Sequence, residues 1–109
     1  MKGVKGDKLI RKVLNSKKKL RSTGFTVGCL ATDDIEKRAL VVISKKIFKK
    51  ANKRNKLRRR IKAVLIKNQE LVFKNYNIIC IQVFSKELLL IEYKELEKRI
   101  LDIFYKIIT

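Results

Sequence analysis

The sequence predicts a small α/β (α+β) domain in which a mixed sheet of three to four strands packs against three helices. Three apolar stretches have the length of strands, and three longer stretches repeat their apolar residues at helical spacing. They follow one another in the order α–β–β–α–β–α, with room for one more short strand near Arg21–Phe25. No proline, linker composition or internal repeat divides the 109 residues, so we expect one domain over residues 1–109.

The first helix is expected over about Asp7–Leu20, where apolar residues recur on one face. Asp7 suits the start of a helix as a cap or first-turn acid. A turn at Ser22–Gly24 then leads into a strand over Phe25–Ala31, whose alternating pattern predicts one buried face.

A second strand is expected over Arg38–Ser44, because its β-branched run is typical of a strand buried on both faces. The short polar loop before it predicts a hairpin with the Phe25–Ala31 strand. The nearly apolar stretch Ile78–Phe84 predicts a central strand, which can run parallel to Arg38–Ser44 because a helix separates the two. A last helix is expected over about Leu88–Ile108, with acidic residues near its start.

The charge of the chain is strongly unbalanced. The 29 Lys and Arg residues outnumber the 10 Asp and Glu residues, which gives a formal net charge of +19. This self-repulsion predicts a polyanionic partner, either nucleic acid or an anionic membrane. The hydrophobic content of 46% argues against a disordered basic tail. The sequence shows no bilayer-spanning run and no signal peptide, so we expect a cytoplasmic protein without a membrane partner.

Few residues suit chemistry at a catalytic or metal centre. The chain has no histidine, which removes the commonest general base and metal ligand. Carboxylates holding metal ions could still cleave a phosphodiester. However, Asp33 and Asp34 are the only adjacent acids, and a solvated loop suits them better than a metal pair. Cys29 and Cys80 are expected to be buried free thiols. We therefore expect neither a catalytic residue nor a protein-bound metal.

The segment Ser44–Lys62 contains eleven Lys and Arg residues and no acid. Within it, a helix is expected from Lys53 to about Lys67. Its apolar stripe consists of Leu57, Ile61, Val64 and Leu65, and Asn55, Arg59 and Lys62 lie on the opposite side. A helix face that is merely solvated would usually mix both signs of charge, so the lack of acids here favours a binding surface. A membrane-surface or calmodulin-target helix is a weaker alternative, because the small core needs the apolar stripe.

The side chains of Asn52–Lys62 suit a polyanion. Arginine can bind a phosphate through two parallel hydrogen bonds. The amides of Asn52 and Asn55 can bond to sugar, phosphate or base edges. We therefore expect the main nucleic-acid contact at Asn52–Lys62.

A series of motifs makes this expectation more specific. A strand that ends in Ser44-Lys45-Lys46 is followed by Arg54-Asn55-Lys56 and Arg58-Arg59 at the start of a helix. An apolar strand introduced by Tyr76-Asn77 and the Glu-rich helix start Tyr93–Glu97 come next. This order, over nearly the whole chain, resembles that of the bacterial ribonuclease P protein subunit.

The resemblance implies the fold of the second domain of ribosomal protein S5, with a left-handed βαβ crossover that departs from the usual rule. It implies that the partner RNA, using Mg²⁺, removes the 5′ leader of precursor tRNA, while the protein holds no cofactor. One protein would bind one ribonuclease P RNA. The implied RNA-binding residues are Lys45, Lys46, Asn52, Lys53, Arg54, Asn55, Lys56, Arg58, Arg59 and Lys62.

The family also binds the 5′ leader in a cleft between its first helix and the sheet. The candidates for this cleft are Ile10, Leu14, Lys17, Lys18, Lys19, Arg21 and Phe25. Ile10, Leu14 and Gly28 occupy positions where the family often has aromatic residues, so we expect base stacking to be lost there. Phe25 is either the remaining aromatic of the cleft or a core residue. The loop Ile47–Ala51 also departs from the family pattern, and its register suggests a one-residue insertion.

Two other functions remain open on sequence alone. The chain could be a ribosomal or general RNA-binding protein without a processing role. A DNA-binding module is the weaker alternative, because no helix-turn-helix pair is recognisable.

Overall fold

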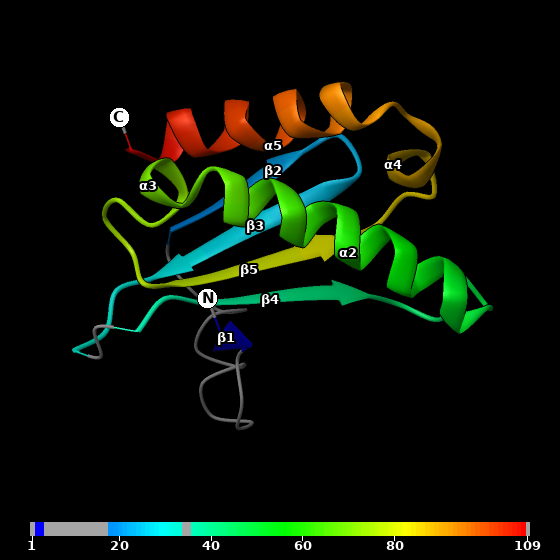
Figure 1. Ribbon diagram of the computed structural model, residues 1–109, viewed down its shortest axis with the longest axis horizontal. Helices are drawn as coiled ribbons and strands as arrows, with labels where there is room; N and C mark the ends of the chain where they lie inside the picture. The colour runs from blue at the N-terminus through cyan, green and yellow to red at the C-terminus, as the bar shows by residue number, and fades with distance from the viewer. Residues whose placement is uncertain (1, 4–17, 34–35, 109) are drawn as a thin grey trace.

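The computed structural model in Figure 1 describes residues 2–3, 18–33 and 36–108 of the chain. Its sheet consists of β1 (Lys2–Gly3), β2 (Lys18–Ser22), β3 (Phe25–Leu30), β4 (Arg38–Ile43) and β5 (Ile78–Val83). The spatial order is β1-β4-β5-β3-β2, with parallel β1–β4 and β4–β5 pairs and antiparallel β5–β3 and β3–β2 pairs. The mixed sheet is therefore confirmed, and the two-residue strand β1 makes it one strand larger than expected.

Four helices lie in the described part of the chain: α2 (Ala51–Lys67), α3 (Gln69–Val72), α4 (Glu87–Leu90) and α5 (Tyr93–Ile108). They cover one face of the sheet (Figure 1). The main core fills the space between them, where alternate residues of β3, β4 and β5 meet the apolar stripes of α2 and α5. Val27, Ile81, Ile61 and Phe104 are all fully buried there.

The connection from β4 through α2 to β5 is a left-handed crossover. In Figure 1 the helices face the viewer and β4 and β5 both run from left to right. The chain leaves β4, returns through α2 in front of the sheet, and enters β5 above β4. A right-handed crossover, which is the usual arrangement, would place β5 on the other side of β4.

The hairpin lies elsewhere than predicted. β5 lies between β3 and β4 and bonds to both, so these two strands do not pair. The hairpin instead joins β2 to β3 through a turn at Gly24, whose φ of 90° suits glycine. The helix predicted over Asp7–Leu20 is wrong at Lys18–Leu20, which begins β2, and residues 7–17 lie outside the described part. The additional short strand predicted near Arg21–Phe25 is confirmed as β2, which begins earlier, at Lys18.

The burial of two strands also differs from the prediction. β3 is buried from Phe25 to Cys29 on both faces, because small Thr26 and Gly28 lie between the longer side chains of β2 and β5. β4 alternates between buried and partly exposed residues, because Ala39, Val41 and Ile43 face the main core while Leu40 and Val42 lie on the opposite face of the sheet. The central position of β5 and its parallel pairing with β4 are confirmed.

The last predicted helix is two helices. α4 ends at Leu90, and Ile91 has an extended backbone (φ −79°, ψ 158°) before α5 begins at Tyr93. The periodic apolar pattern runs through this break, because Leu88 of α4 and Leu96 of α5 both enter the same core. Periodicity alone therefore could not reveal the interruption.

Candidate nucleic-acid interface

Helix α2 places its basic residues opposite the core. It begins at Ala51, two residues before the predicted start, and buries the predicted stripe of Leu57, Ile61, Val64 and Leu65. Figure 1 shows that its N-terminal half extends beyond the ends of β4 and β5. Asn52, Asn55, Lys56 and Arg59 recur at spacings of three and four residues and are all exposed, so they share the solvent face.

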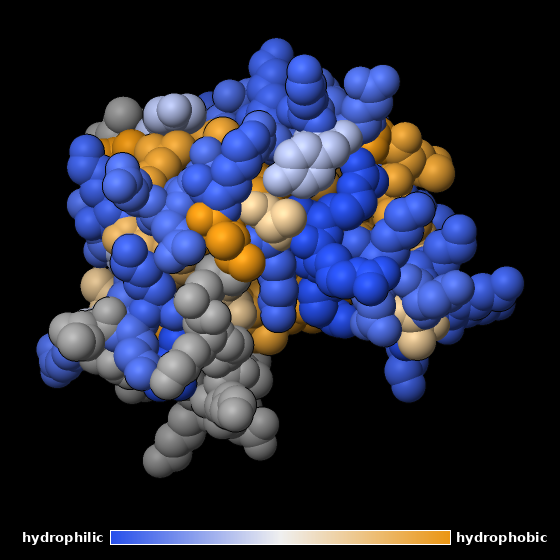
Figure 2. Space-filling view, viewed as in Figure 1, coloured by the Kyte–Doolittle hydropathy of each residue, from blue (hydrophilic) through white to orange (hydrophobic). Residues whose placement is uncertain are grey.

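We call the exposed polar and basic residues of this region the basic helix surface. Its members are Lys45, Lys46, Lys49, Lys50, Asn52, Lys53, Asn55, Lys56 and Arg59, all of which are exposed. Figure 2 shows hydrophilic side chains over the lower right of the molecule, where the start of α2 lies. Three further predicted residues, Arg54, Arg58 and Lys62, are only partly exposed.

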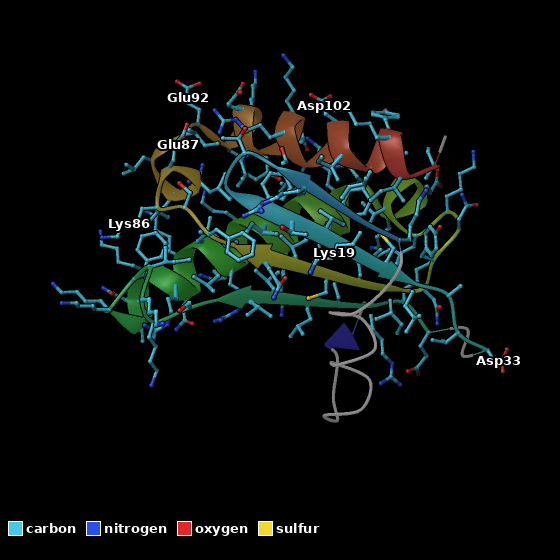
Figure 3. All side chains as sticks on the ribbon, turned by 180° about the vertical axis from the view of Figure 1, so that it is seen from behind. Lys19, Asp33, Lys86, Glu87, Glu92 and Asp102 are labelled. Atoms are coloured by element: carbon cyan, nitrogen blue, oxygen red, sulfur yellow. The ribbon has the colours of Figure 1, made fainter. Side chains whose placement is uncertain are left out.

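Within the described part of the chain, the basic helix surface forms no ion pair with an acidic side chain. The sequence contains no acid between Glu36 and Glu70. Among the described residues, the ion pairs of acidic side chains involve Arg38, Lys67 and Arg99 and no residue of 44–62. The acids labelled in Figure 3 lie on α4, in the link between α4 and α5, on α5 and in the loop at Asp33, away from the start of α2. The described acids therefore do not neutralise this positive charge, which favours a polyanion as the ligand.

Several arginines of α2 also bond to the protein itself. Arg58 donates to Asn55 Oδ1 at 2.9 Å. Arg60 donates to the backbone carbonyl oxygens of Leu89 at 2.8 Å and Ile91 at 2.7 Å. Arg60 is not among the predicted RNA-binding residues, and the sequence does not indicate its structural role, because its acceptors lie about thirty residues away in the chain.

A second polar site lies on the other face of the sheet, which Figure 3 turns toward the viewer. Lys19, labelled there, and Arg21 project from β2 onto this face, because they pair in register with Gly28 and Thr26. Lys19, Arg21, Thr26 and Phe84 line an open pocket of about 340 Å³. The guanidinium carbon of Arg21 lies 5.6 Å from the centre of the Phe84 ring, within cation–π range. We call this site the β2 pocket.

Phe84 was not among the predicted site residues, although it is 51% exposed and supplies the aromatic ring of the β2 pocket. The alternation of β5 could have revealed it. Ile79, Ile81 and Val83 point into the main core, so Phe84 follows on the opposite face. The uniformly apolar composition of Ile78–Phe84 concealed this alternation.

The structure places the predicted leader-cleft residues in three groups. Ile10, Leu14 and Lys17 lie outside the described residues. Lys18, Lys19 and Arg21 are exposed on β2, although only the last two line the β2 pocket. Phe25 is 1% exposed within the main core. This confirms the interpretation of Phe25 as a core residue and excludes its ring from base stacking.

The cysteines are buried free thiols, as predicted, and they lie on opposite faces of the sheet. Burial raises the pKa of Cys29 to about 12 and that of Cys80 to about 11, although nearby Lys18 and Lys19 partly oppose the shift. The residues that the structure describes hold no group of three His, Cys, Asp or Glu side chains suited to a metal ion. Asp33 is exposed, and Asp34 lies outside these residues. None of the described helices is long and apolar enough to cross a membrane.

Comparison with known proteins settles the family. The sequence model of the family Ribonuclease P matches residues 2–108. The chain belongs to the ribonuclease P protein family. It is therefore a subunit of ribonuclease P, an enzyme of tRNA 5′ processing, and its partner is the ribonuclease P RNA. A comparison with curated protein sequences gives no match.

Solved structures of ribonuclease P proteins share the fold. The protein from Staphylococcus aureus has a TM-score of 0.78 at 16% identity, and the match covers 97% of this chain and 94% of that one. The protein from Thermotoga maritima has a TM-score of 0.73 at 21% identity, with coverage of 92% and 90%. These matches confirm the predicted fold class.

Proposed function

We propose that the protein binds ribonuclease P RNA through the basic helix surface and the 5′ leader of precursor tRNA through the β2 pocket. One protein would bind one RNA in the cytoplasm, and the RNA, using Mg²⁺, would cleave the leader. The observation that most strongly supports RNA contact at α2 is its run of exposed basic residues without an acidic partner among the described residues.

The chemistry of the basic helix surface suits an RNA backbone. Asn52, Asn55, Lys56 and Arg59 lie along one helix face and can meet successive phosphates and sugars. The positive charge of Lys56 and Arg59 would replace counterions around crowded phosphates. The protein would therefore lower the Mg²⁺ concentration that the RNA needs, without taking part in bond cleavage.

The β2 pocket suits a single strand rather than a duplex. Lys19 and Arg21 offer positive charge to the backbone, and the exposed ring of Phe84 offers a face on which a base can stack. The family's aromatic positions at Ile10, Leu14 and Gly28 lack aromatic residues here. Phe84 would thus supply a stacking surface from a different strand.

The deciding experiment combines the protein with a bacterial ribonuclease P RNA and measures cleavage of precursor tRNA at low Mg²⁺. We expect the protein to stimulate cleavage and to cleave nothing by itself. Failure to stimulate at any Mg²⁺ concentration would contradict the proposal. If roughly 6–10 phosphates are contacted, affinity should fall about 10³- to 10⁵-fold between 50 and 200 mM salt.

The leader site needs a separate measurement. The complex of protein and ribonuclease P RNA is titrated with precursor tRNA and with tRNA that lacks the leader. We expect the protein to strengthen binding of the precursor selectively. Equal strengthening of both substrates would refute leader contact at the β2 pocket while leaving RNA contact at α2 intact.

A further inference from the structure

The loop Ser44–Lys50, which joins β4 to α2, is ordered by bonds within the protein. The carbonyl oxygen of Ser44 accepts a hydrogen bond from the backbone N–H of Ile47 at 3.0 Å. The Ser44 hydroxyl accepts another from the N–H of Lys46 at 3.1 Å. The side chain of Phe48 is half-buried against the main core. The first half of the loop is therefore fixed by a turn and an apolar contact.

Arg54 fixes the second half of the loop from within α2. Its Nη1 donates hydrogen bonds to the backbone carbonyl oxygens of Phe48 at 2.6 Å and Lys49 at 3.1 Å. The Nη1 group has two hydrogens, so both can be engaged in these bonds. No side chain caps the N-terminus of α2 at Lys50. Among the described residues, Arg54 is the one whose side chain joins the start of α2 to the loop by hydrogen bonds.

We propose that Arg54 is a positioning residue of the RNA interface, which acts on RNA through the lysines of the loop that it holds. These lysines are Lys45, Lys46, Lys49 and Lys50, and all four are exposed. A loop ordered before binding loses less conformational freedom when RNA arrives, so its lysines bind more tightly. This inference rests on the proposed function.

Arg59 provides a matched control on the same helix. Its side chain is exposed and makes no hydrogen bond or ion pair with any residue in 18–33 or 36–108. Arg54 is partly exposed and bonded to two carbonyl groups. The two arginines thus have the same charge and chemistry but differ in their attachment to the loop.

The test is a double-mutant cycle with affinity for a bacterial ribonuclease P RNA as the readout. Arg54→Ala is measured in the unaltered protein and in a background that carries Lys49→Gln and Lys50→Gln. If Arg54 acts through these lysines, its substitution should cost at least about threefold less affinity in the second background. Independent sites should agree within about twofold, which is the result expected for the same cycle with Arg59→Ala.

Charge-preserving variants and hydrogen exchange complete the test. Arg54→Lys keeps the charge but shortens the reach of the donor, so it should weaken RNA binding more than Arg59→Lys, which exchanges one exposed cation for another. In Arg54→Ala, exchange should accelerate at the Phe48 amide, which bonds to the Ser44 carbonyl oxygen at 3.4 Å and belongs to a residue whose carbonyl Arg54 holds, while the buried turns of α2 keep their protection.

The outcomes separate this inference from the proposed function. If the unaltered protein binds the RNA but the Arg54 cycle is additive, or exchange at the Phe48 amide is unchanged, the positioning role is overturned. If the unaltered protein does not bind the RNA, the proposed function fails first and the positioning role fails with it.

Discussion

Arg60 Nη2 donates a 2.7 Å hydrogen bond to the backbone carbonyl oxygen of Ile91, the residue at which α4 gives way to α5. The Nη1 group of the same arginine binds the carbonyl oxygen of Leu89 at 2.8 Å. Arg60 therefore ties α2 to the break between the last two helices and satisfies carbonyl groups that the interrupted helix leaves open.

Substitution of Arg60 should reduce stability rather than RNA binding. Arg60→Ala removes both bonds and leaves two carbonyl groups without this partner, so we expect a loss of about 1–3 kcal/mol in the free energy of unfolding. Urea denaturation measures this loss. The dependence of RNA affinity on salt should stay as in the unaltered protein, and a reduced dependence would instead show that Arg60 contacts phosphate.

Arg59 should behave in the opposite way. Its side chain is exposed, so Arg59→Ala should change the free energy of unfolding by no more than about 0.5 kcal/mol. If it contacts one phosphate, the slope of log affinity against log salt should fall by about 1. Lys98→Ala on α5 is the control, because it removes the same charge from an exposed position away from the basic helix surface. Equal effects of the two variants would argue for a diffuse charge effect.

Phe84 should affect only substrates that carry a 5′ leader. One stacked base contributes about 1–3 kcal/mol, so Phe84→Ala should weaken precursor binding by roughly 5- to 150-fold. Phe84→Leu is the control that keeps an apolar side chain without an aromatic face, and it should lose most of the same affinity. Binding of leaderless tRNA should not change in either variant. If Phe84→Leu binds the precursor as tightly as the unaltered protein, the ring contributes only apolar packing.

The two thiols predict a loss of stability at alkaline pH. Burial raises the pKa of Cys29 to about 12 and of Cys80 to about 11 from an ordinary value of 9.0. The folded state therefore holds these protons more tightly, and their contribution to stability is complete below pH 9 and declines as the pH rises toward 11. At pH 10 the loss is about 1 kcal/mol for each thiol.

The measurement compares unfolding at pH 8 and pH 10 for the unaltered protein and for a variant with Cys29→Ala and Cys80→Ala. Lysines titrate in both proteins, so their effect cancels in the comparison. The variant should lose about 2 kcal/mol less than the unaltered protein over this interval. Equal losses would show that the thiols ionise as readily in the folded protein as in the unfolded chain.

Local periodicity predicted the parts of the fold in which one segment contacts one core. The apolar stripe from Leu57 to Leu65 predicted which side of α2 is buried, and the apolar run from Ile78 predicted the central strand. Pairing between distant segments was not predictable in this way. The hairpin was misplaced because nothing near Phe25 or Ile43 indicates that β5 will lie between their strands.

The candidate site shows the same division. The basic residues of Ser44–Lys62 could be found from composition and motif, since a charge run is visible in the sequence. The distinction among its arginines could not, because Arg54 and Arg60 differ from Arg59 only through backbone carbonyl groups that folding brings near them. Phe84 was missed because the uniformly apolar run Ile78–Phe84 conceals which face its side chain occupies, and its proximity to Arg21 of another strand arises only on folding.

The acid-free stretch between Glu36 and Glu70 gives ionic strength two opposite effects on this protein. In the free protein, dissolved ions screen the repulsion among the crowded cations, so added salt should make the fold more resistant to unfolding. In the complex, the same ions compete for the phosphates and weaken association. The free protein is thus least stable to unfolding at the low salt concentrations at which it binds RNA most tightly. Bound RNA would then provide the stabilisation that salt provides to the free chain.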